Sequence, residues 1–146
     1  MPEKKTTARA RKAKREGKAP TTQAGEYVRE EIDHIREGKH GGKNTKQAIA
    51  IGLSKARRAG VDLPSPKRGS ASDRPRKQAK RDVAKGKSAT SRPTSAKRSR
   101  AATKALKRAP RTAASPRALS RQGRQAAKRR KKTASRPRTK RAAAKE

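Results

Sequence analysis

Apolar side chains gather in one short part of the chain, residues 23–63. Val28, Ile32 and Ile35 are separated by four and then three residues, the spacing of one face of an α-helix. The opposite face of the same helix carries the acidic residues Glu26, Glu30, Asp33 and Glu37. The pattern predicts an amphipathic helix over residues 24–37 that ends at Gly38. Its carboxylates are expected to face solvent; the alternative is that they bind the cationic tail of the same chain and compete with DNA.

A second helix is predicted over residues 45–59. Asn44 is a favoured N-cap residue, Gln47 stands at the third helical position as in a capping box, and Gly60 is a typical C-terminal stop. The apolar stripe of this helix consists of Ile49, Leu53 and Ala56. Because the two stripes match in length, we expect the helices to pack as an antiparallel hairpin.

Ile51 does not fit this stripe. At about 100° per residue it lies roughly opposite Ile49. A singly exposed apolar residue is common and needs no function. The alternative is a second packing surface, used for self-association or for a partner protein.

The rest of the chain is dominated by charge. Residues 64–146 hold 30 Lys or Arg against three acids, no aromatic residue, and only Val83, Leu106 and Leu119 as sizeable apolar side chains. Such a segment is not expected to bury enough apolar surface to offset the entropy lost on ordering. The sequence therefore predicts a mostly disordered chain with a small all-α helical hairpin. Its parts are a disordered basic arm (1–22), the hairpin (23–63) and a disordered basic tail (64–146).

Two tail blocks favour helix more than the others. Ser95–Ala109 and Arg117–Ser135 lack proline and are rich in Ala, Lys and Arg. Repulsion between their cations opposes helix formation in free solution. We expect coil in the free chain and partial helix when phosphate neutralises the charge.

The formal net charge of +35 on 146 residues points to a polyanionic partner. Selective reading of single strands relies on aromatic stacking, and the chain has a single aromatic residue, Tyr27, expected at the edge of the hairpin core. Backbone binding to duplex DNA needs no aromatic residue and is favoured, although structured RNA satisfies the same electrostatics.

Phosphate contacts are expected from cations in the hairpin and the tail. The tail cations include those beside the Ser-Pro turns at Ser65 and Ser115 and in the Arg-Pro joints, which either enter a groove or only neutralise phosphates. The candidate nucleic-acid-binding residues are Lys39, Lys43, Lys46, Lys55, Arg57, Arg58, Lys67, Arg68, Arg74, Arg76, Arg92, Lys97, Arg98, Arg117, Arg129, Arg130, Lys131, Lys132, Arg136 and Arg138.

The glycine-rich turn between the helices has two interpretations. Flexible backbone amides of the run from Gly38 to Thr45, with Lys39, Lys43 and the following helix N-terminus, make a combination that holds phosphate. Alternatively, the glycines serve only a tight turn. The segment is no nucleoside-triphosphate loop, because Glu37 stands where that motif needs its first glycine.

Neither catalysis nor a metal site is expected. His34 with Glu30 or Glu37, and His40 beyond them, lack a recognisable third or fourth convergent ligand. The chain has no cysteine, which excludes disulfides and thiolate metal sites. We therefore expect no cofactor and no enzyme activity.

The stretch from Arg36 to Gly41, followed by Lys46 to Gly60, resembles a family of short bacterial proteins described as DNA-binding or of unknown function. The likeness covers roughly residues 23–63 and implies no catalytic residue. The tail is similar in composition to the C-terminal domains of linker histones and to bacterial histone-H1-like proteins. Together these resemblances imply a nucleoid-associated protein that coats or compacts DNA.

The expected function is thus binding of duplex DNA without sequence preference, by neutralisation of phosphates. With no apolar leader and no run of 18 apolar residues, we expect a cytoplasmic, nucleoid-associated protein that makes no membrane contact. Two alternatives stay open. One is an RNA- or ribosome-associated basic protein, and the other is an adaptor that recognises a protein through the hairpin near Ile51.

Overall fold

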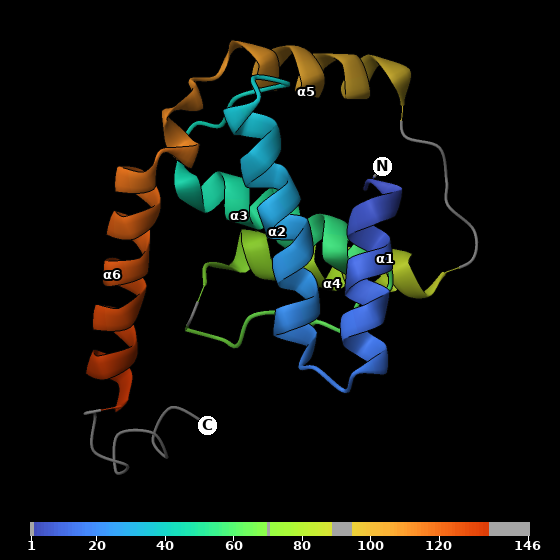
Figure 1. Cartoon of the computed structure of the whole chain (residues 1–146), viewed down its shortest axis with the longest axis vertical. Coiled ribbons are helices and arrows are strands. Elements are labelled where there is room, and N and C mark those ends of the chain that lie inside the picture. Colours follow the sequence, from blue (N-terminus) through green and yellow to red (C-terminus); the bar gives the residue numbers. More distant parts are fainter. Residues whose placement is uncertain (1, 70, 89–94, 135–146) are drawn as a thin grey trace.

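The protein is built almost entirely of helices (Figure 1). The computed structural model describes residues 2–69, 71–88 and 95–134. In chain order the elements are α1 (Lys4–Arg15), α2 (Pro20–Arg36), α3 (Thr45–Arg58), α4 (Asp73–Lys87), α5 (Ala96–Arg108), the 3-10 helix η1 (Arg111–Ala114) and α6 (Pro116–Ala134). Within those residues the sole β-type pairing is an isolated bridge between Arg68 and Ala71.

The expectation of a mostly disordered chain is wrong. The arm over residues 1–22 forms α1, and the tail from residue 64 onward contains α4, α5 and α6. The two tail blocks, for which only partial helix was expected, coincide with α5 and α6. Helix propensity of Ala, Lys and Arg supplies part of the reason. The other part is that buried Ala, rather than large apolar residues, provides tail contacts, as at Ala79, Ala113 and Ala114.

The local helix signals are confirmed. The Asn44 side chain accepts a hydrogen bond from the Gln47 backbone N–H at 2.8 Å, and the Gln47 side chain accepts one from the Lys43 N–H at 2.8 Å. Gly38 and Gly60 follow α2 and α3 with φ of 77° and 86°, in the left-handed region that glycine adopts easily. Capping therefore sets the α2 C-terminus and both ends of α3.

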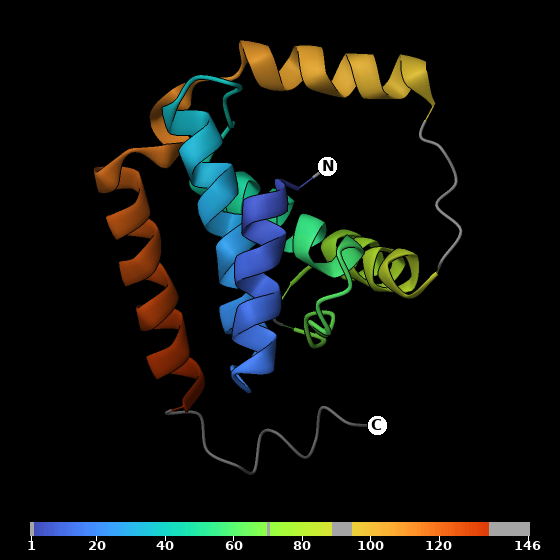
Figure 2. The ribbon, with the colours of Figure 1, turned by 45° about the vertical axis from the view of Figure 1, so that its right-hand side comes forward.

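The packing of α2 and α3 differs from the predicted antiparallel hairpin. The antiparallel neighbour of α2 is α1, and α3 runs across α2 instead of alongside it (Figures 1 and 2). The crossing is made possible by Gly52, because a Cβ at this position would lie 2.6 Å from the Cα of Val28. The absence of a side chain lets the two backbones touch, and a crossed arrangement follows.

The core lies where α1, α2 and α3 meet. Tyr27 is 1% exposed and packs in a cluster with Ala10, Ala24, Ala56, Val61 and Leu63. Burial raises the pKa of its hydroxyl above the ordinary value. Tyr27 is thus an internal residue, not one at the edge of the core. A second cluster joins Ile35 and Ala48 to Ala114 of η1, which ties the tail to the core.

The acidic face of α2 is partly internal, contrary to the prediction of a solvent face. Glu30 is 5% exposed because α1 covers it, and its neighbour Glu31 is 1% exposed. Glu30 accepts hydrogen bonds from the Glu3 backbone N–H at 3.1 Å and from the Lys55 ammonium at 3.2 Å. The same ammonium lies 2.7 Å from Glu31 Oε2. These contacts join α1, α2 and α3 through charge.

Helix α4 docks on α3 through Asp82, which is 1% exposed. Its carboxylate accepts hydrogen bonds from the Ser54 hydroxyl at 2.7 Å and from the Arg58 guanidinium at 2.8 Å. Ile51, one turn before Ser54, is partly buried on this side of α3. The face that carries Ile51 is therefore a packing surface inside the chain, and self-association through it stays a prediction.

The glycine turn holds the tail. Gly41 and Gly42 donate their backbone N–H groups to the carbonyls of Leu106 and Pro110, at 2.8 and 2.9 Å. A Cβ on Gly41 would overlap the carbonyl of Ala109, so only glycine permits this approach. These two amides of the turn are thus bonded to the chain's own backbone and are not free for a phosphate.

Substituting Gly52 tests the helix crossing. Gly52→Ala is expected to destabilise the fold by about 1–3 kcal/mol, because the new methyl group meets the Val28 backbone. Gly123→Ala in α6 is the matched control: nothing lies within 4 Å of its Cβ position, and this change should be neutral or stabilising by up to about 1 kcal/mol. Urea unfolding followed by circular dichroism measures both. Equal effects of the two substitutions would contradict the crossing.

The buried carboxylate on α2 predicts acid sensitivity. Burial raises the pKa of Glu30, but hydrogen bonds from Thr6, the Glu3 N–H and Lys55 hold this pKa below its ordinary value. Its contacts therefore stabilise the fold above about pH 4.3, the unfolded-state value, and are lost as the pH falls through the lower folded-state pKa.

Glu30→Gln should accordingly lower the thermal midpoint at pH 7 and flatten its dependence between pH 3 and pH 5. The exposed Glu37→Gln is the control and should keep the wild-type slope. Thermal unfolding across this pH range gives the answer, and an unchanged slope in Glu30→Gln would show that other groups carry the acid response.

Candidate nucleic-acid interface

Several cations predicted to contact nucleic acid bind groups of the chain itself. Lys55 pairs with the buried Glu30 and Glu31. Arg57 is 7% exposed and donates hydrogen bonds to the carbonyls of Leu63 and Pro64, both at 3.3 Å. Arg58 binds Asp82 at 2.8 Å. These three side chains hold α3 against its neighbours, and their contact with nucleic acid stays a prediction.

Other predicted cations are scattered over the surface. Lys39 pairs with Glu37 at 2.9 Å and with Glu3 at 3.4 Å, and the hydrogen bond to Glu37 raises the pKa of its ammonium. Arg76 pairs with Asp73 at 2.7 Å. Exposed positions are taken by Lys67, Arg68, Arg74, Lys97, Arg98, Arg129, Arg130, Lys131 and Lys132. Arg92, Arg136 and Arg138 lie outside the described residues.

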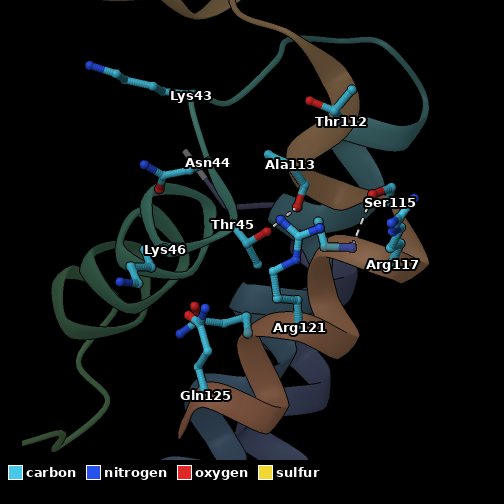
Figure 3. A pocket seen from close by; sticks show the side chains of 12 residues that line it. Lys43, Asn44, Thr45, Lys46, Thr112, Ala113, Ser115, Arg117, Arg121 and Gln125 are labelled. Carbon is cyan, nitrogen blue, oxygen red and sulfur yellow. Dashed lines mark hydrogen bonds between the residues drawn. The ribbon is translucent and has the colours of Figure 1, made fainter.

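Three predicted cations come together at one cleft between the start of α3 and the first turns of α6 (Figure 3). Lys43 and Lys46 stand on the α3 side and Arg117 on the α6 side. The cleft measures about 470 Å³. Its other lining residues are Asn44, Thr45, Thr112, Ala113, Ser115, Ala118, Arg121, Gln122 and Gln125.

Hydrogen bonds fix the relative positions of the segments that form the cleft. The Thr45 hydroxyl donates to the Ala113 carbonyl at 2.7 Å, in a buried position that fixes the start of α3 against η1. The Ser115 hydroxyl accepts from the Ala118 N–H at 3.3 Å and caps α6. Both helices therefore begin at this cleft, and helix N-termini carry partial positive charge and favour anions.

The side chains of the cleft add full positive charges. Figure 3 shows Arg121 reaching from α6 toward Thr45, while Lys43 extends outward at the rim. No acidic residue lines the cleft, and within the described part of the chain Lys43, Lys46, Arg117 and Arg121 form no ion pair. The sequence has no carboxylate side chain between Asp82 and Glu146 that could neutralise them. The cleft is suited to an anion such as phosphate.

The positive charge continues from the cleft along α6. Arg117, Arg121, Arg124 and Lys128 are spaced by four, three and four residues, which places them on one face of the helix. Arg121, Arg124 and Lys128 were not among the predicted residues. Their spacing in the sequence was the available signal. It was not used because the tail was expected to be coil, and this spacing places residues on one face only in a helix.

A second basic surface lies on α5. A shallow groove there is lined by Ser99, Arg100, Thr103, Lys104, Lys107 and Arg108. No residue of α5 is buried. Figures 1 and 2 show α5 and α6 on different outer sides of the helical core, extending in different directions. The two basic surfaces are therefore separate.

A possible metal-binding group lies elsewhere, at the end of α2. Donor atoms of Glu31, His34 and His40 fall within 4.8 Å of one another. Sequence reasoning considered the two histidines but did not place Glu31 beside them. Its spacing of three residues from His34 was the available signal.

The comparisons with known proteins concern the first half of the chain. Residues 10–68 match a family described as a family of unknown function (DUF6496). This match covers the second half of α1 with α2, α3 and the following segment, a wider region than the resemblance over residues 23–63, and it carries no statement about DNA. No curated protein and no solved structure shows significant similarity to the chain. Across the described residues, no helix is both long and apolar enough to cross a bilayer.

Proposed function

We propose that the protein binds duplex DNA through its phosphate backbone, with little preference for sequence. The observation that carries the proposal is the carboxylate-free cleft at the starts of α3 and α6, continued by the cationic face of α6. In this arrangement a phosphate in the cleft meets two helix N-termini and several cations at once.

The nature of the surface favours a duplex over single strands. Tyr27, which is the sole Phe, Tyr or Trp in the chain, is buried and cannot stack on a base. A helix of 19 residues such as α6 is about 28 Å long, enough to follow a backbone or enter a major groove. Lys and Arg on phosphates position the protein without reading sequence.

Two separate basic surfaces support a role in coating or compacting DNA. The α6 face and the α5 groove can bind different duplexes, or distant stretches of one duplex, at the same time. A protein of this kind would be found with cellular DNA. Single-molecule stretching of long DNA tests compaction, and tight binding without shortening would limit the proposal to coating.

Neutralising the cleft gives the main test. The quadruple variant has Gln at Lys43, Lys46, Arg117 and Arg121. The slope of log affinity for duplex DNA against log salt concentration should be about 3.6 less negative than in the wild type, because each of the four phosphate contacts contributes about 0.9. Binding to a labelled duplex across a salt series measures the slope.

The matched control removes the same charge from α1, with Gln at the exposed Lys4, Lys5, Arg11 and Lys14. Equal loss of slope in both variants would show that binding depends on net charge and not on the cleft. Competition with a structured RNA belongs to the same experiment. Preference for RNA would reject duplex DNA and support the RNA- or ribosome-associated alternative.

The geometry of the cleft can be tested without changing charge. Thr45→Val removes the donor to the buried Ala113 carbonyl, which should cost about 1–3 kcal/mol and loosen η1 and the start of α6. Faster amide hydrogen exchange there and weaker DNA binding are the expected results. Thr112→Val, at an exposed cleft position, is the control and should change neither. Unchanged DNA affinity in Thr45→Val would show that binding does not need a fixed cleft.

A further inference from the structure

Three side chains with metal-ligand chemistry converge where α2 ends. Glu31 and His34 lie three residues apart on α2, and the chain then turns at Gly38 and brings His40 back to them. One donor atom from each residue lies within 4.8 Å of the other two. The histidine rings are 6.0 Å apart and nearly perpendicular, so that they converge without stacking.

The hydrogen bonds of His40 leave one ring nitrogen for a cation. Its Nδ1 lies 3.1 Å from the Gly41 carbonyl. A carbonyl only accepts, so Nδ1 carries the proton. In the neutral ring the lone pair of Nε2 then faces Glu31 Oε1 at 3.3 Å. Two electron-rich atoms face each other stably only when a second proton or a metal ion lies between them.

The distance between these two atoms suits a metal. Ligands at about 2.0–2.1 Å around a tetrahedral ion are separated by about 3.3 Å. A backbone carbonyl on the remote ring nitrogen is the usual arrangement for a metal-binding histidine, because it fixes the ring and its tautomer. His40 is therefore oriented as a ligand would be.

Glu31 differs from the carboxylates of an ordinary surface charge cluster, because it is buried. It is 1% exposed, and among the described residues its Oε1 accepts no hydrogen bond. Lys55 neutralises one side, with its ammonium 2.7 Å from Oε2. Oε1 faces His40, and a carboxylate that binds a metal through one oxygen could use this atom.

A fourth group stands beside the three. The Glu3 carboxylate lies 2.8 Å from His34 Nε2 and 3.4 Å from the Lys39 ammonium. It can orient the His34 ring from outside or, after a side-chain rotation, join the ligands. Glu3 precedes α1, so the group spans three parts of the fold: the residue before α1, helix α2 and the glycine turn.

We propose that Glu31, His34 and His40 form a binding site for a divalent transition metal ion of the Zn²⁺ type, with Glu3 or water in the fourth position. Two imidazoles favour such an ion over Mg²⁺ or Ca²⁺, which prefer oxygen ligands throughout. The ion would fasten α2 to the turn whose Gly41 and Gly42 amides hold the tail. The inference is independent of DNA binding.

The full chain without a histidine tag permits a clean test, because it contains two histidines and no cysteine. The metal-free protein is titrated with Zn²⁺ in a calorimeter and with Co²⁺ in a spectrophotometer. We expect one ion per chain and a higher thermal midpoint with Zn²⁺. With Co²⁺ we expect an absorption band in the visible range, of the kind that a four-coordinate Co²⁺ ion gives. Absence of one-to-one binding at micromolar ion would overturn the proposal.

Two substitutions locate the ion. His40→Gln should weaken Zn²⁺ binding by at least about 100-fold, since even the loss of an outer-shell partner costs 10- to 100-fold. The control Asp33→Asn removes an exposed-side carboxylate from the same helix and should leave the affinity within twofold. Equal affinities of His40→Gln and the wild type would place the ion elsewhere and reject the site.

A measurement on the wild-type chain keeps the test decisive if His40→Gln does not fold. Nitrogen-15 NMR of the two imidazoles should show one nitrogen of each ring shifting on addition of one equivalent of Zn²⁺, with His40 Nδ1 still protonated. Ring signals that stay unchanged would overturn the proposal.

Discussion

Two adjacent buried carboxylates, Glu30 and Glu31, organise the rest of the structure. Charges taken out of water are costly unless other groups compensate them. Here the compensation comes from the residue before α1 through the Glu3 N–H, and from α3 through Lys55. The two partners lie in different parts of the chain. The need to compensate these charges therefore draws the helices together around α2.

This arrangement explains how a chain with so few large apolar residues folds. The disorder prediction rested on the scarcity of Val, Ile, Leu and aromatic side chains. However, the contacts between helices are made by alanine and glycine, which bring backbones close. Ala24, Ala48 and Ala56 are fully buried, and Gly52 lies on the Val28 backbone. Close approach gains dispersion contacts and costs no side-chain entropy, so apolar side-chain volume underestimates the stability available.

The features that the sequence predicted are local, and those it missed depend on distant partners. The Asn44 cap and the Gly60 stop act within a few residues, so a reader of the sequence can find them. Asp82 gave no comparable signal, because Ser54 and Arg58 stand more than 20 residues away. The same distinction explains why Lys55, Arg57 and Arg58 were expected to bind nucleic acid: nothing nearby in sequence shows that each of them binds a group of the chain itself.

The candidate interface follows the same logic. Lys43, Lys46 and Arg117 were predicted as separate cations, and only the Thr45 contact with Ala113 makes them walls of one cleft. Arg121 joins the cleft because this part of the tail is helical, which places Arg121 on the same helix face as Arg117. Thus the composition predicted that the surface is positively charged, but the shape of the cleft depends on tertiary contacts that the composition does not show.

The division of charge between the two halves of the chain has an energetic consequence. Ten of the eleven carboxylate side chains lie in residues 3–82, whereas α5 and α6 have none. The like charges of these helices repel one another, and α5, with no buried residue, has few contacts to offset that repulsion. Salt weakens the repulsion only beyond about 8–10 Å at physiological strength. A bound polyanion would remove it directly, so binding and tail docking should stabilise each other.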